Sequence, residues 1–233
     1  MAVDLSFMLS NYILELEVIR THETRKENIM NQIDLYKLLE NRSEVIRRLY
    51  FVLVHRGYRE DRIGITRHPI NDTLEMQFKL NVSDIIKDAN VCVCDSLLAR
   101  LDICEELLFA AAMDNTQFMC PYLLQSLEET LNVDLGLDDI PMYVLTNKQL
   151  HHGAGVILYP GMKKRIEELI GDFVVLPSSI HETILIPESL NNPEVVNIIQ
   201  EVNRTTVDEL EVLSDRPYKL IEDMVLKEVE FAK

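Results

Sequence analysis

The residues that could most directly do chemistry lie in one short stretch, Leu176-Pro177-Ser178-Ser179-Ile180-His181-Glu182. Nucleophilic catalysis needs a hydroxyl group beside a base that a third group orients. Ser178 or Ser179 would supply the hydroxyl group, His181 the base, and Glu182 or Asp172 the orienting carboxylate. The stretch therefore gives one hypothesis, a hydrolase or transferase centred on Ser178, Ser179 and His181.

A structural interpretation competes with this one. A serine and a histidine two or three residues apart in a hairpin do not reliably face each other, and the stretch lacks the G-x-S-x-G pattern of an activated serine. In this interpretation, the hydroxyl groups of Ser178 and Ser179 bond the backbone of a turn, and His181 fixes the entry to a strand. We favour it, and therefore predict no catalytic residue.

Other residues of the metal-binding types do not form a recognisable site. The neighbours His151 and His152 would point in different directions on a strand or loop. The chain has four cysteines without C-x-x-C spacing: Cys92, Cys94, Cys104 and Cys120. Zinc sites usually show such spacing. We therefore predict no metal and no cofactor, and we interpret the cysteines as free thiols of a cytoplasmic protein.

The charge of the chain is unevenly distributed along the sequence. Residues 1–70 contain 11 Lys and Arg against 10 Asp and Glu, a net charge of +1, whereas residues 71–233 contain 12 against 29, a net charge of −17. This acidic excess repels nucleic acid and anionic membranes. Neither is expected as a partner.

The most basic window spans residues 42–68. One hypothesis is a regulator whose arginines bind an anionic ligand, and its candidate residues are Arg47, Arg48, Arg56 and Arg59. The alternative, which we favour, is that these arginines pair with acidic residues of the same chain.

The composition indicates a chain that folds in the cytoplasm. Hydrophobic residues make up 47% of the sequence, enough for a packed core. No apolar run approaches the roughly 18 residues that cross a bilayer. The N-terminus has Asp4 and no Lys or Arg before Arg20, which is unlike a signal peptide.

Residues 1–46 show helical spacing. Apolar residues recur every three or four positions in two series, Leu5, Met8, Tyr12, Leu16 and Ile19, then Ile29, Ile33, Tyr36 and Leu39. The first series is widened by Phe7, Leu14 and Val18, so that helix must be covered on more than one side. We expect these N-terminal helices to bind a protein partner or a second copy of the chain.

Residues 47–134 mix strands and helices. A buried strand is predicted over 49–54, a strand with one buried and one wet face over 73–82, and a short strand over 91–94. Asp102 and Glu105 have the spacing of a capping box that opens a helix ending before Pro121. A short helix is predicted over 126–131.

Residues 135–233 predict the order β-β-α-β-β-α. The strands are expected over 142–145, 155–159, 173–176 and 183–186, with tight-loop glycines at 153 and 155. One helix covers 162–170 and ends at Gly171. The other follows Asn192, with Val195, Ile198, Ile199 and Val202 as its buried stripe. Hairpins mixed with helices indicate an α+β fold with mixed or antiparallel sheets. A domain boundary is predicted near 133–140.

With these elements placed, the C-terminal half resembles a family of uncharacterised bacterial proteins known only as a domain of unknown function. The matching segments are Tyr143-Val144-Leu145-Thr146-Asn147, Gly153-Ala154, Leu158-Tyr159-Pro160-Gly161, the stretch 176–182, and Glu211-Val212-Leu213-Ser214-Asp215. The resemblance is good from about residue 47 onward and weak before it, as in a short, N-terminally divergent member. The family implies no activity and no catalytic residue.

The sequence therefore favours a non-catalytic cytoplasmic binding or interaction module that self-associates. The alternatives are the hydrolase or transferase and the anion-binding regulator described above.

Overall fold

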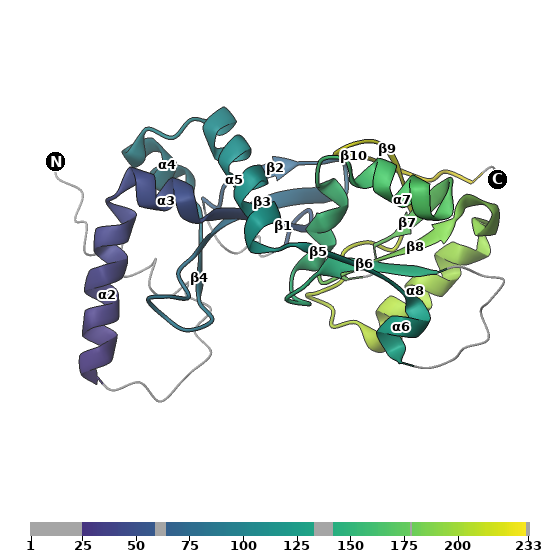
Figure 1. The fold of residues 1–233 in the computed structure, drawn as a ribbon, viewed down its shortest axis with the longest axis horizontal. Helices are drawn as coiled ribbons and strands as arrows, with labels where there is room; N and C mark the ends of the chain where they lie inside the picture. The colour runs from purple at the N-terminus through teal and green to yellow at the C-terminus, as the bar shows by residue number, and fades with distance from the viewer. Residues whose placement is uncertain (1–24, 59–63, 133–141, 178, 232–233) are drawn as a thin grey trace. The chain divides into compact units, whose positions relative to one another are not determined.

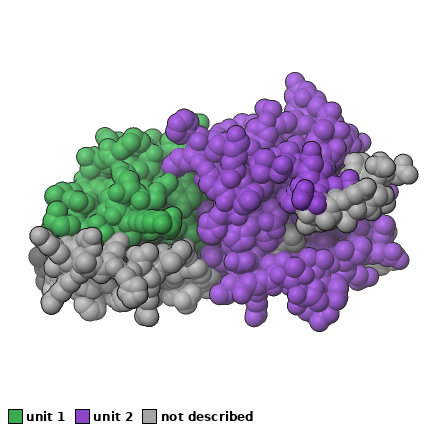
Figure 2. Space-filling model, turned by 60° about the horizontal axis from the view of Figure 1, so that its bottom comes forward, with its two compact units in different colours: residues 1–51, 62–66, 77–115 green, residues 52–61, 67–76, 116–233 purple. Residues whose placement is uncertain are grey.

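The computed structural model describes residues 25–58, 64–132, 142–177 and 179–231. These residues form helices and antiparallel sheets, which confirms the predicted α+β class. The chain divides into two compact units whose segments alternate along the sequence (Figure 2). Unit 1 takes residues 1–51, 62–66 and 77–115, and unit 2 takes residues 52–61, 67–76 and 116–233. Among the described residues, no helix is long and apolar enough to cross a membrane.

Unit 1 consists mainly of helices. It contains α2 (Arg25–Leu39), α3 (Arg42–Arg48), β4 (Asn90–Cys92), α4 (Asp95–Leu101) and the start of α5 (Glu105–Met119) (Figure 1). Asn41 caps α3, because its side chain accepts hydrogen bonds from the backbone N–H groups of Ser43 and Glu44. The sulfur of Cys94 accepts a bond from the N–H of Leu97 and caps α4 in the same way.

A four-stranded sheet contains β1 (Leu49–His55), β3 (Leu74–Asn81) and β2 (Arg67–Pro69) in that order, with β4 also paired to β3. The predicted strands at β1 and β3 are confirmed, but the wet face predicted for β3 is wrong. Every residue of β3 except Asn81 is buried. Alternation of polar and apolar residues shows that two faces differ, and it does not show that one face meets water. Glu75 tolerates burial because Arg67 forms an ion pair with it.

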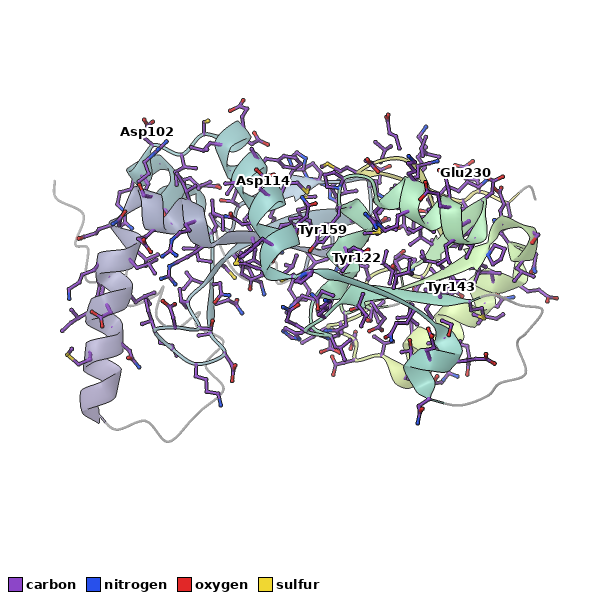
Figure 3. All side chains as sticks on the ribbon, in the orientation of Figure 1. Asp102, Asp114, Tyr122, Tyr143, Tyr159 and Glu230 are labelled. Atoms are coloured by element: carbon purple, nitrogen blue, oxygen red, sulfur yellow. The ribbon has the colours of Figure 1, made fainter. Side chains whose placement is uncertain are left out.

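The predicted capping box at Asp102 is wrong. Asp102 has a left-handed backbone (φ 53°) and ends α4, with its N–H bonded to the carbonyl oxygens of Ala99 and Leu98. Figure 3 shows its side chain at this turn. Aspartate caps helix starts but also tolerates the left-handed region, so spacing alone does not separate the two roles. A capping box does form at Ser126, which opens α6 (Leu127–Leu131) together with Glu129.

Unit 2 contains a six-stranded antiparallel sheet in the order β10-β9-β7-β8-β6-β5. Its strands are β5 (Tyr122–Ser126), β6 (Tyr143–Asn147), β7 (Phe173–Leu176), β8 (Thr183–Pro187), β9 (Tyr218–Glu222) and β10 (Val225–Glu228). The predicted pairing of the strands on either side of the 177–182 turn is confirmed, with Val175 opposite Leu185.

The strand predicted over 155–159 is wrong. Residues 153–158 form a buried 3-10 helix, η1 (Gly153–Leu158). An apolar run this short has no periodicity that separates a strand from a buried helical turn. The order in this half is therefore β6, η1, α7 (Met162–Ile170), β7, β8, η2 (Glu188–Leu190), α8 (Glu194–Thr206), β9 and β10. α7 ends at Gly171, as predicted.

α8 and α7 lie on opposite sides of the six-stranded sheet (Figure 1). Val195 and Ile199 of α8 pack into a buried cluster with Val174, Leu176 and Ile186 of the sheet. The predicted buried stripe is only half right, because Ile198 and Val202 are exposed. The sheet covers one narrow side of this helix, and neighbouring apolar residues fall outside the contact.

This division of α8 gives a matched pair of variants. Ile199 is 3% exposed and Ile198 is 59% exposed. Ile199→Ala should lower the free energy of unfolding by about 2–5 kcal/mol, because it leaves a cavity in the core. Ile198→Ala should change it by less than about 0.5 kcal/mol. Urea denaturation of both variants measures the difference, and equal losses would show that this assignment of the buried side is wrong.

Candidate functional site

Ser179 lies in the turn between β7 and β8 and bonds to the turn itself. Its hydroxyl group donates a hydrogen bond to Glu182 Oε1 at 2.7 Å and accepts one from the backbone N–H of His181 at 3.1 Å. Ser178, the other serine of the stretch, lies outside the described residues. The hydroxyl proton of Ser179 therefore points to a carboxylate and not to an imidazole ring.

Both ring nitrogens of His181 face other partners. Nδ1 accepts a hydrogen bond from the backbone N–H of His152 at 3.2 Å, and Nε2 lies 3.2 Å from Glu211 Oε1. An accepting Nδ1 means that the neutral ring carries its proton on Nε2, where it is donated to Glu211. The sequence brings Ser179 and His181 close, but this geometry gives the serine no base, in keeping with the structural interpretation of the stretch.

The loop 148–152, between β6 and η1, is strained. Leu150 (φ 55°) and His152 (φ 50°) both have left-handed backbones, which cost roughly 1–2 kcal/mol for residues other than glycine. The side chain of Asn147 holds the loop by donating to the carbonyl oxygen of His151 at 2.8 Å and accepting from its N–H at 3.3 Å. The strain is thus offset by specific hydrogen bonds.

Three histidine rings gather beside this loop. The ring centroids of His151 and His152 are 4.1 Å apart, and that of His181 lies 5.1 Å from the first and 5.7 Å from the second. Among the residues described, no group of three or more His, Cys, Asp or Glu side chains could hold a metal ion.

Gly153 allows the backbone of η1 to touch its neighbours. A Cβ atom there would lie 2.5 Å from the carbonyl oxygen of His181 and 2.7 Å from the amide nitrogen of Asn147. The hydroxyl group of Thr146 donates to that same carbonyl oxygen at 2.7 Å, and the N–H of Ala154 donates to the carbonyl oxygen of Ile180 at 3.2 Å. The expected tight loop is in fact a site of close backbone packing.

We call residues 209–216 the floor segment. Its Glu211 carbonyl oxygen accepts from the N–H of Ile180 at 2.9 Å, Val212 forms an isolated bridge with Ser179, and the N–H of Ser214 donates to the carbonyl oxygen of Pro177 at 3.0 Å. Four of the segments quoted from the sequence therefore meet in one place: 143–147, 153–154, 176–182 and 211–215.

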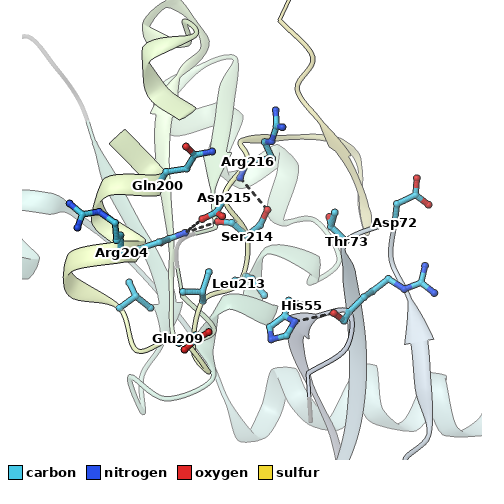
Figure 4. Close-up of a pocket in the computed structure, with 14 residues that line it drawn as sticks. His55, Asp72, Thr73, Gln200, Arg204, Glu209, Leu213, Ser214, Asp215 and Arg216 are labelled. Atoms are coloured by element: carbon cyan, nitrogen blue, oxygen red, sulfur yellow. Dashed lines mark hydrogen bonds between the residues drawn. The ribbon is translucent and has the colours of Figure 1, made fainter. Parts of the chain in front are cut away.

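An open cavity of about 980 Å³ lies within unit 2, and the floor segment forms part of its lining. Figure 4 shows Leu213, Ser214 and Asp215 between Gln200 and Arg204 of α8 on one side and His55 and Thr73 on the other. The charged residues of its lining are three arginines and three carboxylates: Arg56, Arg204, Arg216, Asp72, Glu209 and Asp215. The lining of the cavity therefore carries charges of both signs.

A chain of hydroxyl groups lies behind the floor of this cavity. Tyr218 is fully buried, and its hydroxyl group bonds to those of Thr73 and Ser214. Burial raises the pKa of Tyr218, so its hydroxyl group stays protonated.

Asn203 of α8 ties the floor segment to the helix. Its Nδ2 donates to the carbonyl oxygen of Ser214 at 3.0 Å and to Asp215 Oδ1 at 2.8 Å. Its Oδ1 is buried, and within the described part of the chain it has no hydrogen-bond partner. These bonds fix the polar wall of the cavity.

The four candidate arginines separate into different roles. Arg47 pairs with Glu44, and Arg48 pairs with Glu44 and forms two bonds to Asp84, at 2.5 and 2.8 Å. The Arg48 guanidinium lowers the pKa of Asp84. Arg56 alone of the described candidates lines the cavity, and Arg59 lies outside the described residues.

Sequence reasoning missed most of the cavity. Thr73 directly precedes β3, Asn203 lies in α8, and Tyr218 begins β9. No local spacing in the sequence marks any of them as part of a site. Two signals were available, Arg56 in the basic window and the segment Glu211–Asp215, which was noted as a family signature without a role.

Comparison with known proteins gives one match. A model of the family DUF5688, described as a family of unknown function, matches residues 13–220. The match extends across much of the N-terminal region where the resemblance noted from the sequence is weak. No curated protein and no solved structure matches significantly.

The close packing at Gly153 predicts a large cost for a methyl group. Gly153→Ala should lower the free energy of unfolding by about 3 kcal/mol, because the new Cβ atom would meet backbone that cannot turn away. Gly161→Ala is the matched control. That position has open space around it and a left-handed backbone (φ 75°, ψ 4°), so the substitution should cost only about 1 kcal/mol. Chemical denaturation measures both, and a Gly153→Ala cost no larger than the control would contradict the prediction.

Proposed function

Since the chain belongs to DUF5688, a family of unknown function, we propose that it is a non-catalytic cytoplasmic binding module. Its ligand is a small zwitterionic molecule, such as an amino acid or short peptide, bound in the cavity of unit 2. The observation that carries this proposal is the mixed charge of the cavity lining.

The charges of the lining explain the choice of ligand. Arg56, Arg204 and Arg216 come from three separate parts of the chain, so the positive charges of the lining do not come from one segment. Charged groups at a binding site favour ligands of complementary charge. Three guanidinium groups and three carboxylates together suit a ligand with an anionic group and an ammonium group better than a purely anionic one.

The ion pairs of the arginines in the lining support the same choice of ligand. Arg204 bonds to Glu201, and Arg216 lies 3.7 Å from Glu228, in pairs that water screens and that contribute little to stability. Such guanidinium groups can turn to a ligand at small cost. Within the described chain, the side chains of Arg56 and Glu209 have no partner.

Two further features support a non-catalytic role in the cytoplasm. Both ring nitrogens of His181 face other groups, and the Ser179 hydroxyl group donates to Glu182, so neither acts on the other. All four cysteines are free. Free thiols are typical of proteins in reducing compartments.

Ligand binding can be tested by thermal shift and calorimetric titration with free amino acids and dipeptides. Acetate and putrescine serve as the anion-only and cation-only comparisons. We expect a zwitterion to raise the melting temperature, since a ligand that binds only the folded state stabilises it, and we expect the two comparison compounds to have no such effect.

The residues that carry this binding can be tested with the same ligand. Arg216→Gln and Glu209→Gln should each weaken its affinity about tenfold, because each removes a charged hydrogen-bonding group. Arg47→Gln, in unit 1, should leave the affinity unchanged. Failure of every zwitterion to bind, or equal affinity in Arg216→Gln and Arg47→Gln, would contradict the proposal.

We further propose that the chain self-associates through its N-terminal helices. Residues 1–24 lie outside the described residues, so the support comes from α2. Its Leu35, Leu38 and Leu39 are buried, whereas Met30 and Ile33 are 52% and 43% exposed. These two residues lie three positions apart and so share one side of the helix.

Light scattering on the full chain tests this. We expect the wild-type protein to be dimeric or larger, and Met30→Lys/Ile33→Lys to shift it toward the monomer, since charges oppose burial of that surface. Lys37→Gln, also on α2, is the control and should leave the mass unchanged. A wild-type monomer at all concentrations would rule out self-association.

A further inference from the structure

We infer that His181 is a proton-operated switch that exchanges its bond to the loop 148–152 for a stronger bond to the floor segment. The switch itself stands on the contacts of His181, and its regulation of binding rests on the function proposed above.

The neutral ring holds both sides at once. Its Nδ1 lone pair accepts the N–H of His152, and its Nε2 proton faces Glu211. The imidazole is the side chain that ordinarily changes charge between about pH 5 and 8. The charged and titratable groups around it are Glu211 at Nε2, the rings of His151 and His152, and Glu182, whose carboxylate accepts from Ser179.

Protonation affects the two bonds in opposite ways. A proton on Nδ1 would face the N–H of His152, and two donors cannot bond each other, so the contact with the loop is lost. The bond from Nε2 to the Glu211 carboxylate becomes charge-assisted and stronger.

The strain of the loop makes it responsive to this loss. His152 and Leu150 both have left-handed backbones, and the bond to His181 is one of the contacts that hold them there. Asn147 still holds His151 when that bond breaks. Acidification should therefore release the part of the loop around His152 without unfolding β6.

The same event reaches the cavity through the floor segment. Glu211 is followed directly by Val212, Leu213 and Ser214, which line the cavity. Ser179 and Ile180 directly precede His181, and they pair with Val212 and Glu211 of the floor segment. A tighter bond between His181 and Glu211 therefore holds the cavity wall more firmly against the 177–182 turn, and ligand affinity should depend on pH.

Hydrogen–deuterium exchange on the full chain, corrected for intrinsic rates, tests the switch without any ligand. From pH 7.5 to pH 5.5, exchange in residues 150–153 should rise at least about fivefold, which corresponds to roughly 1 kcal/mol. Exchange in residues 211–214 should fall or stay constant. His181→Gln, which cannot titrate, should abolish the response, and His151→Gln should keep it. Parallel loosening of both segments, or a response that survives in His181→Gln, would overturn the inference.

A second measurement uses the wild-type protein and so does not depend on the folding of a variant. Nitrogen-15 NMR of the histidine rings at pH 7.5 should show His181 with its proton on Nε2. A proton on Nδ1 would overturn the switch, because that nitrogen could not accept the N–H of His152.

Ligand affinity measured at the two pH values distinguishes regulation by His181 from the proposed binding function. If the zwitterions do not bind at either pH while exchange behaves as expected, the proposed function fails and the switch stands. If a zwitterion binds with the same affinity at both pH values, the cavity is a binding site and its regulation by His181 is refuted.

Discussion

The backbone of Gly153 lies against Thr146, Asn147 and the carbonyl oxygen of His181, and the local order of unit 2 depends on this approach. Backbones that pack this closely must satisfy each other's polar groups, since water cannot reach them. The hydroxyl group of Thr146 and the N–H of Ala154 do so. The end of β6, the start of η1 and the turn after β7 therefore form one closely packed junction.

The turn 177–182 connects this junction to the rest of the unit. On one side it bonds to the junction, and on the other it pairs with the floor segment, which Asn203 in turn joins to α8. The residues that resemble catalytic groups thus hold neighbouring backbone segments together. These residues also influence the shape of the cavity, because the floor segment that they contact forms part of its wall.

Local signals were sufficient for the local structure. The hairpin of β7 and β8, the end of α7 at Gly171 and the cap at Asn41 each follow from residues adjacent in sequence. The failures came where a distant partner decides the outcome. Burial of Glu75 in β3 depends on an ion pair with Arg67, and the buried side of α8 depends on where the sheet lies.

The candidate site shows the same limit more strongly. The stretch 176–182 was found from its residue types, but the partner of His181 was not, because Glu211 gave no sign of its role. The cavity could not have been predicted at all. Thr73 and Tyr218, whose hydroxyl groups bond behind its floor, are 145 residues apart, and no periodic pattern relates positions at such a separation.

The alternation of the two units along the chain constrains how the protein can fold during synthesis. Residues 67–76 belong to unit 2, yet Asn71 and Thr73 bond to Leu226 and Tyr218, near the other end of the unit. At roughly 5–20 residues per second, a ribosome needs roughly 7–30 s to deliver those partners. β1 and β3 pair within residues 49–81 and can form early, but the bonds of Asn71 and Thr73 must wait for the C-terminal part of unit 2. Neither unit can be completed and set aside before the other begins.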